Sequence, residues 1–328
     1  MHFGLSEDQQ ELAELIRGLL ARRGDSMAVR AAIEGDDGFD RALWTTLCEQ
    51  VGVAALAVPE EYDGAGATLF ESAVVLEELG QALSPVPMLA STLAVTALRL
   101  HGTEEQRTGL LPRIAAGEIA TVVLDPDTVL DAPYAEIVLA LVGEGAETRV
   151  EQVEAPVTGL VGVDQTIGLG AVDAPVAPQG PLRDVAAALA TALQVGAAQR
   201  GLDMTVSYAK ERVQFGRAIG SFQALKHRMS DMLVLLETSR SVSWAASAAA
   251  AAYLEEPGQE QAALLAERSA VARSWCTDAL AKVASETVQL HGGIAITWEH
   301  DAHLVFKRAH ALGQLFGQPH EHRARIAL

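Results

Sequence analysis

Apolar residues in the first third of the chain recur every three to four positions, in five stretches separated by short turn signals. This spacing predicts helices over residues 5–20, 39–51, 69–79, 88–100 and 104–116. Ser6 precedes two acidic residues and Gln9, and Thr103 precedes two acidic residues and Gln106. This arrangement caps a helix and places negative charge in its first turn, so we expect both residues to begin helices. Residues 58–67, which include one proline and two glycines, are expected to form a loop.

The pattern changes near Ile119. The segments that follow are short and rich in Val, Ile and Thr, and they predict strands over residues 121–124, 137–142, 149–153, 158–163 and 171–176. From Leu182 the helical period returns, over residues 185–210, 222–253, 259–290 and 301–315. We therefore predict a mostly α fold with a small β-domain. Its parts are an all-helical N-terminal domain (1–118), a truncated middle β-domain (119–181) and a C-terminal four-helix bundle (182–328).

Charge and composition exclude several classes of function. A formal net charge of −19 repels nucleic-acid phosphate, although a local cluster of arginines can still bind a small anion. No apolar run reaches the roughly 18 residues of a membrane span. The two cysteines, Cys48 and Cys276, are far apart, and neither they nor the histidines at positions 291, 300, 303 and 310 show metal-ligand spacing. We expect a cytoplasmic protein without a metal, whose histidines are mainly solvated or capping residues.

Two strings in the predicted bundle carry the candidate chemistry. The first is Glu211-Arg212-Val213-Gln214-Phe215-Gly216, followed by Ile219, Phe222 and Gln223, and the second is Gln289-Leu290-His291-Gly292-Gly293. They resemble the Arg-x-x-Phe-Gly-x-x-Ile-x-x-Phe-Gln and Gln-x-x-Gly-Gly segments of the acyl-CoA dehydrogenase family. Weaker resemblances to the same family lie at Trp44, Gly52, 58–66, 102–106 and 111–112.

The resemblance implies that these strings bind the FAD of a neighbouring subunit. An arginine offers a fork of donors to pyrophosphate oxygens, which makes Arg212 the first candidate. Glycines let backbone amides approach a ligand closely, as expected for Gly292 and Gly293. The full set of implied cofactor-binding residues is Arg212, Gln214, Phe215, Ile219, Phe222, Gln223, Leu225, Gln289, Gly292 and Gly293. The alternative interpretation is a surface arginine paired with Glu211, two core phenylalanines and an ordinary helix-ending diglycine.

The chain departs from the family where a catalytic base is needed. In the family a glutamate removes the α-proton of the thioester while a hydride from the β-carbon passes to the flavin. The two positions that carry this glutamate correspond here to Gly317 and Ala186. We therefore assign no catalytic residue to this chain. Asp184 and Glu321 lie nearby in sequence and are the candidates for a displaced base.

The middle region is the second departure. The stretch that corresponds to the family's Thr-Glu-Pro…Gly-Ser-Asp string reads Val122-Val123-Leu124-Asp125-Pro126-Asp127, without a Gly-Ser-Asp after it. All four tryptophans lie outside this region. A shortened sheet would leave one face of a flavin ring uncovered. We therefore expect that this chain does not bind an FAD of its own.

Together these features resemble the shortened subunit of the heteromeric acyl-CoA dehydrogenases of actinobacterial steroid side-chain breakdown. The resemblance implies a flavoprotein oxidoreductase of lipid metabolism in which this chain pairs with a full-length homologue as an α2β2 heterotetramer and shares one FAD per pair. The implied substrate is a steroid side-chain CoA thioester, and the implied electron acceptor is an electron-transfer flavoprotein. Two alternatives stay open, a self-sufficient homotetrameric acyl-CoA dehydrogenase with a displaced base and a non-enzymatic scaffold protein of the same fold.

Overall fold

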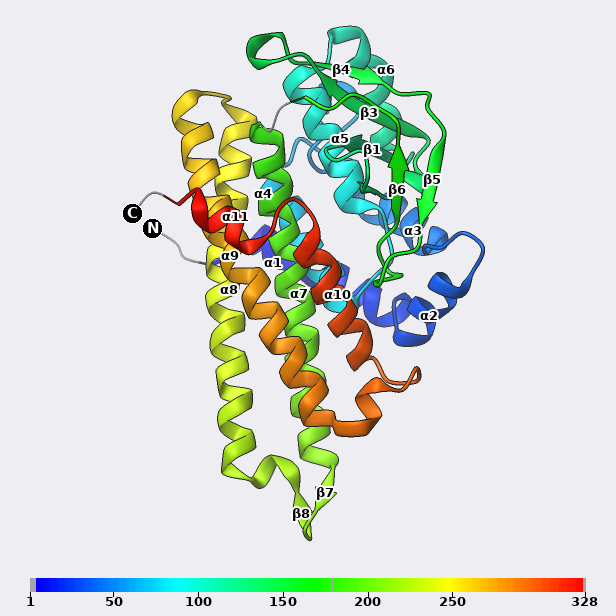
Figure 1. Cartoon of the computed structure of the whole chain (residues 1–328). Helices are drawn as coiled ribbons and strands as arrows, with labels where there is room; N and C mark the ends of the chain where they lie inside the picture. The colour runs from blue at the N-terminus through cyan, green and yellow to red at the C-terminus, as the bar shows by residue number, and fades with distance from the viewer. Residues whose placement is uncertain (1–3, 178–179, 327–328) are drawn as a thin grey trace.

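The computed structural model describes residues 4–177 and 180–326. Residues 1–3, 178–179 and 327–328, which belong to the three predicted domains, lie outside the described residues. In sequence order the structure has helices, then strands, then helices again (Figure 1). β1 begins at Ala120 and α7 at Pro181, next to the predicted boundaries at 119 and 182. That each region is a separate domain stays a prediction.

The helices before the sheets follow the predicted pattern, with one addition. They are α1 (Glu7–Arg23), α2 (Ser26–Glu34), α3 (Arg41–Val51), α4 (Leu69–Ala82), α5 (Met88–His101) and α6 (Glu104–Ala115). Ser6 and Thr103 form capping boxes with Gln9 and Gln106, which confirms both predicted helix starts. α2 was not predicted; it has only nine residues, of which Val29 alone is buried. The 58–67 loop contains the short 3-10 helix η1 (Glu60–Tyr62).

The middle region forms two three-stranded sheets. One has the order β1 (Ala120–Val123), β3 (Ile137–Val142), β4 (Arg149–Gln152), with β1 and β3 parallel and β3 and β4 antiparallel. The other has the order β2 (Val129–Leu130), β6 (Leu169–Val172), β5 (Val157–Leu160) and is antiparallel throughout. Each predicted strand overlaps a strand of the structure, but β5 ends at Leu160 and β6 shares only residues 171 and 172 with the predicted 171–176. The two-residue β2 was too short to show a periodic pattern. The short 3-10 helices η2 (Ala132–Tyr134) and η3 (Gly145–Glu147) lie in the connections.

The four long helices predicted for the C-terminal part are α7 (Pro181–Glu211), α8 (Gln223–Glu255), α9 (Gln259–His291) and α10 (Ala302–Gln314). α7, α8 and α9 run side by side along the molecule (Figure 1). The additional elements are the hairpin β7 (Val213–Gln214) and β8 (Arg217–Ala218), the 3-10 helices η4 (Ile219–Ser221) and η5 (Gly292–Ile296), and the short helix α11 (Pro319–Ala324). No helix in the described part of the chain is long and apolar enough to cross a membrane.

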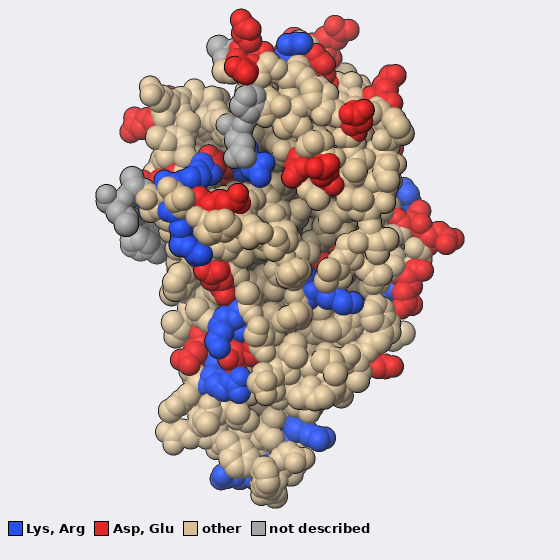
Figure 2. All heavy atoms as spheres, in the orientation of Figure 1, with Lys and Arg blue, Asp and Glu red and all other residues tan. Residues whose placement is uncertain are grey.

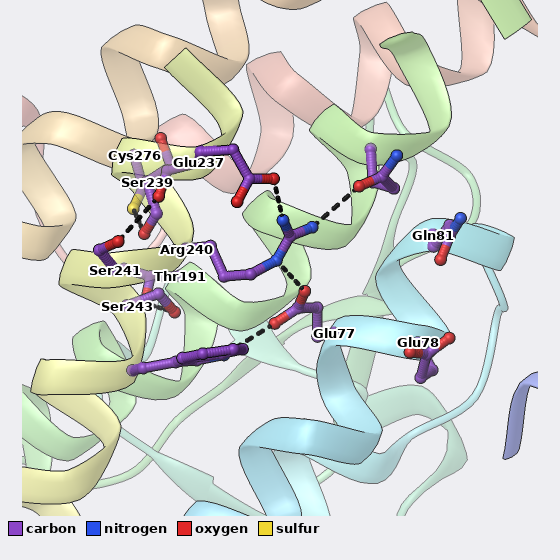
Figure 3. Close-up of polar contacts among 12 residues, drawn as sticks. Glu77, Glu78, Gln81, Thr191, Glu237, Ser239, Arg240, Ser241, Ser243 and Cys276 are labelled. Atoms are coloured by element: carbon purple, nitrogen blue, oxygen red, sulfur yellow. Dashed lines mark hydrogen bonds and ion pairs between the residues drawn. The ribbon is translucent and has the colours of Figure 1, made fainter. Parts of the chain in front are cut away.

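α4 and α7 cross at two glycines, which joins the first helices to the bundle. A Cβ on Gly80 would lie 2.5 Å from the Leu193 carbonyl oxygen, and a Cβ on Gly196 would lie 2.0 Å from that of Glu77. At this crossing the Glu77 carboxylate accepts hydrogen bonds from Arg240 Nε (2.8 Å) and Trp244 Nε1 (3.1 Å), and Arg240 also binds Glu237 (Figure 3). The backbones of α4 and α7 therefore meet at the place where the Glu77 carboxylate of α4 binds Arg240 and Trp244 of α8.

Candidate functional site

The two strings that resemble cofactor-binding segments lie together at one end of the bundle. Arg212 follows the last residue of α7, and the β7–β8 hairpin projects beyond it (Figure 1). Gln289 lies in the last turn of α9, and Gly292 and Gly293 begin η5. The ring of Tyr208, one helical turn before Arg212, stacks on the ring of His291 with a centroid distance of 4.5 Å. The fold thus brings together residues about eighty positions apart in sequence.

The hairpin presents Phe215 to solvent. Gln214 pairs with Arg217, so Phe215 and Gly216 form a two-residue turn, and both have positive φ (53° and 77°), as a type I′ turn requires. The Phe215 side chain is 92% exposed, so it is not a core residue. The Ile219 amide donates to the Arg212 carbonyl (2.8 Å) and closes the base of the hairpin. The backbone therefore holds an unusual turn that leaves an aromatic ring available to a partner.

The candidate residues differ in exposure. Seven of them are exposed: Arg212, Gln214, Phe215, Gln223, Gln289, Gly292 and Gly293. Phe222 and Leu225 are half-buried and Ile219 is buried. These three side chains therefore also pack against the rest of the protein. The Arg217 guanidinium lies 4.1 Å from the centroid of the Phe222 ring. Within the described residues no ion pair joins Arg212 to Glu211, so the guanidinium is available to another group.

Positive charge concentrates at this end of an acidic chain. Residues 205–230 contain five Lys or Arg and one Glu, whereas the whole chain has 24 Lys or Arg and 43 Asp or Glu. Figure 2 shows Lys and Arg on the lower tip of the bundle, and Asp and Glu mostly over the upper and right-hand margins. A Cβ on Gly292 or Gly293 would meet no atom within 4 Å, so both backbones face open space. The Gly292 amide itself donates to the Val288 carbonyl, so the local positive field is the feature that suits the phosphates of a dinucleotide.

The stretches that correspond to the family's own flavin and base positions also meet, but the space between them is small. Val122, Asp125, Leu315 and Phe316 all line one cavity, which has a volume of about 40 Å³. A second cavity, lined by Leu130 and Leu315 among others, measures about 30 Å³. Ligand sites for small molecules usually measure roughly 300 to 1,000 Å³. Neither cavity has room for a flavin ring.

The loop between β5 and β6 fills this region. Asp164 forms an ion pair with Arg308 of α10 (2.7 Å), and the Thr166 hydroxyl contacts both side chains. Thr166 and Ile167 line the 30 Å³ cavity beside Asp131, whose pKa is raised to about 7 by burial. Sequence analysis did not single out Asp164 or Arg308. The sequence signal that could have identified Arg308 is a charged residue on the otherwise apolar face of α10.

A larger cleft of about 600 Å³ is lined by residues 123–126, which belong to the stretch that corresponds to the family's Thr-Glu-Pro…Gly-Ser-Asp string. It lies between the end of β1 and the start of α7, and its lining includes His101, Arg183 and Tyr253. Burial lowers the pKa of His101, which therefore favours the neutral form. Leu315 and Phe316 are not among the described residues that line this cleft. The cleft is large enough for a ligand, but no described residue of the stretch that carries the catalytic base in the family lines it.

Neither base position carries an ionisable group. Gly317 has φ of 101°, and a Cβ there would lie 2.9 Å from His322 Nε2, which donates to the Phe316 carbonyl (3.0 Å). Ala186 is buried in α7. Asp184 forms an ion pair with Arg325 (2.7 Å).

Glu321 accepts from the Gln318 amide (2.7 Å), a backbone hydrogen bond that lowers the pKa of its carboxyl group and weakens it as a base. Among the described residues, neither Asp184 nor Glu321 lines the two small cavities. Their role as displaced bases stays untested, and their present contacts do not favour it. No group of three or more His, Cys, Asp or Glu that could hold a metal occurs in the described ranges.

Gly317→Ala is expected to lower the free energy of unfolding by about 1 to 3 kcal/mol, because a side chain is strained at this φ and would displace His322. Chemical denaturation measures the change. Gly109→Ala is the matched control, because a Cβ at Gly109 meets no atom within 4 Å and Gly109 lies inside α6. Equal stability of the Gly317→Ala variant and the unmodified protein would contradict the strain that we assign to this position.

Comparisons with known proteins show the family to which the chain belongs. The family model described as acyl-CoA dehydrogenase, N-terminal domain, matches residues 6–118, and the model described as acyl-CoA dehydrogenase, C-terminal domain, matches residues 184–327. The acyl-CoA dehydrogenase IpdE2 of Mycolicibacterium smegmatis is 45% identical over 326 residues, which cover 98% of this chain and 98% of that protein.

Two solved structures of related assemblies are similar over nearly the whole chain. A chain of the ChsE4-ChsE5 complex from Mycobacterium tuberculosis has a TM-score of 0.85 and 27% identity, with 99% of this chain and 97% of that chain covered. A chain from a variant of the Tcur3481-Tcur3483 steroid ACAD has a TM-score of 0.84 and 27% identity, with 98% and 96% covered. By its sequence matches and its fold, this chain belongs to the acyl-CoA dehydrogenase family.

Proposed function

We propose that this chain is the shortened subunit of a heteromeric FAD-dependent acyl-CoA dehydrogenase. It contributes Arg212, the hairpin and the diglycine turn to a flavin site that it shares with a full-length homologue, and it supplies no base. The observation that carries the proposal is a contrast within one molecule. The end of the bundle that would serve a neighbour is exposed and positively charged, whereas the cavities that reach Leu315, close to the base position, measure only about 40 and 30 Å³. The 600 Å³ cleft, which residues 123–126 line, does not include Leu315 or Phe316 among its described lining residues.

Exposed apolar side chains at the same end support a subunit contact. Phe215 is 92% exposed and Ile296 77% exposed, and Val213, Ile294 and Trp298 also reach solvent. Clustered exposed apolar side chains rimmed by polar residues mark interaction surfaces more often than free solvent-facing surface. A second subunit that brings a flavin to this end would cover them. The positive charge of residues 205–230 would then face the pyrophosphate.

The relatives favour the same assembly and substrate class. ChsE4-ChsE5 is a complex of two named chains, and the Tcur3481-Tcur3483 protein is a steroid ACAD. By analogy, the substrate is a steroid side-chain CoA thioester and the assembly is an α2β2 heterotetramer. The family binds FAD, which when bound accepts the hydride from the β-carbon, and we propose that an electron-transfer flavoprotein then takes the electrons. The role of this chain is to bind and orient the cofactor and to exclude water from its phosphates.

Co-expression with each full-length acyl-CoA dehydrogenase of the same genome tests the proposal. We expect a yellow complex with about one FAD per pair of chains, and a colourless preparation of this chain purified alone. Absorbance of released flavin against protein concentration gives the stoichiometry. Two flavins per pair, or FAD bound to this chain alone, would refute the division of roles.

A self-sufficient enzyme is the second candidate, and one observation favours it. The 600 Å³ cleft between β1 and α7 is large enough for a ligand, and its lining includes Val123, Leu124, Asp125 and Pro126 of the stretch that corresponds to the family's flavin-contacting string. Against this candidate, the cleft does not include the positions that carry the base in the family. FAD that copurifies with this chain alone and dehydrogenation without a partner would establish the second candidate.

A further inference from the structure

Three aromatic rings connect the two strings at the end of the bundle. The rings of Tyr208 and His291 stack with centroids 4.5 Å apart and an interplanar angle of 28°. The ring of His300 lies 4.6 Å from that of His291 and 6.5 Å, edge-on, from that of Tyr208. Tyr208 comes from α7, His291 from the last residue of α9, and His300 from the turn before α10. The stack therefore joins three separate segments.

The stack lies next to the exposed residues that we propose bind the partner's flavin, namely Arg212 and the diglycine turn Gly292-Gly293. Tyr208 precedes Arg212 by one helical turn, and the backbone N–H of Arg212 donates to the Tyr208 carbonyl oxygen (2.8 Å). His291 immediately precedes Gly292 and Gly293, which begin η5. His300 follows η5 and precedes the first residue of α10. The rings therefore lie between the end of α7, which carries Arg212, and the segments on either side of the diglycine turn.

The hydrogen bonds of the two imidazoles constrain their protonation differently. His291 Nδ1 lies 2.7 Å from the Thr287 carbonyl oxygen, and because a carbonyl only accepts, Nδ1 carries a proton. Burial lowers the pKa of His291, but the backbone of Met204 acts in the opposite direction, so these contacts do not require a neutral His291. His300 Nδ1 accepts from the Ala302 amide (3.2 Å), and because an amide N–H only donates, this nitrogen must be bare. A second proton on His300 would occupy Nδ1 and break the bond that holds the start of α10. The observed turn therefore requires a neutral His300.

The surroundings of His300 disfavour its charged form. Burial lowers the pKa of His300, and the neighbouring His291, His303 and Arg30 lower it further. Asp301 opposes this effect, but its carboxylate is already held by Arg30 and Arg200 at 2.8 Å each and by the Ser26 hydroxyl. Burial also lowers the pKa of His291 and of His303, and Lys307 acts in the same direction on His303.

Because the pKa of His300 in the folded protein is depressed, the contact that needs the neutral ring is stable above the ordinary histidine pKa. It persists below that value and is lost as the pH falls through the lower pKa that His300 has in the folded protein. The ordinary value is 6.5, so the loss begins in the mildly acidic range.

From these contacts we infer that Tyr208, His291 and His300 form a positioning stack that holds the diglycine turn beside Arg212 only while the His300 imidazole is neutral. Mild acidification therefore weakens the binding of the dinucleotide at this end of the bundle. This inference rests on the proposed function, because it assumes that the end of the bundle binds the flavin of a partner. The residues of the stack position the site and do not themselves touch the reacting atoms.

Two replacements of His300 separate the hydrogen bond from the titration. Asparagine accepts from an amide two residues ahead and does not titrate, so His300→Asn keeps the bond and removes the proton site. His300→Ala removes both. His310→Gln is the control, because His310 is an exposed histidine of α10 outside the stack. FAD release from the complex with the full-length partner is followed by flavin fluorescence at about pH 8 and about pH 5.5, on either side of the histidine titration.

We expect release from the wild-type complex to be about 5- to 20-fold faster at the lower pH, the size of a coupling carried by one local equilibrium. His310→Gln should behave like wild type. His300→Asn should match wild type at the higher pH and change less than about twofold between the two conditions, whereas His300→Ala should release FAD rapidly in both. A His300→Asn complex as pH-dependent as wild type, or a His300→Ala complex that retains FAD like wild type at the higher pH, would overturn the inference.

A measurement on this chain alone keeps the test independent of the partner. Amide exchange at Ala302 should be slow in wild type and in His300→Asn at about pH 8, and faster in His300→Ala. If exchange at Ala302 is equal in all three, the histidine does not hold the turn and the inference fails, whatever the partner does. If exchange follows the expected order but no full-length homologue yields a flavin complex, the stack stands and the proposed function fails.

Discussion

Arg308→Met is expected to lower the free energy of unfolding by about 3 to 5 kcal/mol, because it leaves the buried Asp164 carboxylate without its counter-ion. The two side chains are 2% and 1% exposed, and their ion pair joins the β5–β6 loop to α10. Thr166, which also contacts the guanidinium, would lose a partner as well. Equilibrium denaturation in urea, followed by circular dichroism, measures the change.

An exposed ion pair is the control for this prediction. Arg149 and Glu151 are 60% and 48% exposed, so Arg149→Met should cost no more than about 1 kcal/mol. The double variant Arg308→Met with Asp164→Leu should recover much of the loss, because no buried charge is then left unpaired. A cost for Arg308→Met as small as that for Arg149→Met would show that the β5–β6 loop is not held by this pair.

Arg212→Ala is expected to weaken FAD binding in the complex roughly 10- to 150-fold. A hydrogen bond to a charged group contributes about 1.5 to 3 kcal/mol, and each 1.4 kcal/mol is a factor of ten in affinity. Arg212→Lys should lose part of this affinity, because it keeps the charge but not the planar fork. Equilibrium dialysis of the complex, with flavin absorbance as the readout, compares the variants.

Arg268→Ala is the matched control for Arg212, because Arg268 is an exposed arginine on α9 outside both strings. Its complex should retain FAD like the wild type. If the Arg212→Ala complex keeps its yellow colour through dialysis as the Arg268→Ala complex does, Arg212 does not bind the cofactor phosphates.

Periodicity predicted the elements that are long enough to show a period. The bounds of β3 are those predicted, residues 137–142, because a fully buried strand is a continuous apolar run between turn residues. α2, β2 and α11 were missed because each is short and α2 has a single buried residue. The β7–β8 hairpin was missed because its turn places Phe215, and not a glycine or asparagine, at a positive φ.

The site was predictable only in part. The two strings were found from residue types and spacing, but nothing in the sequence places Tyr208 against His291, which is a contact between two helices. His300 was grouped with solvated or capping histidines, and it does accept from a backbone amide at the start of α10. The Asp164–Arg308 pair joins residues 144 positions apart, and sequence alone does not report that both charges are buried.

The glycine crossing of α4 and α7 has a consequence for how the chain unfolds. Gly196 rests against the backbone of Glu77, whose side chain binds Arg240 of α8, so α4 cannot leave the bundle without exposing several layers of packed helix at once. We therefore expect α4 to lose its structure together with α7 and α8 and not before them. A variant that destabilises α7 would then lower the melting temperature of α4 as well.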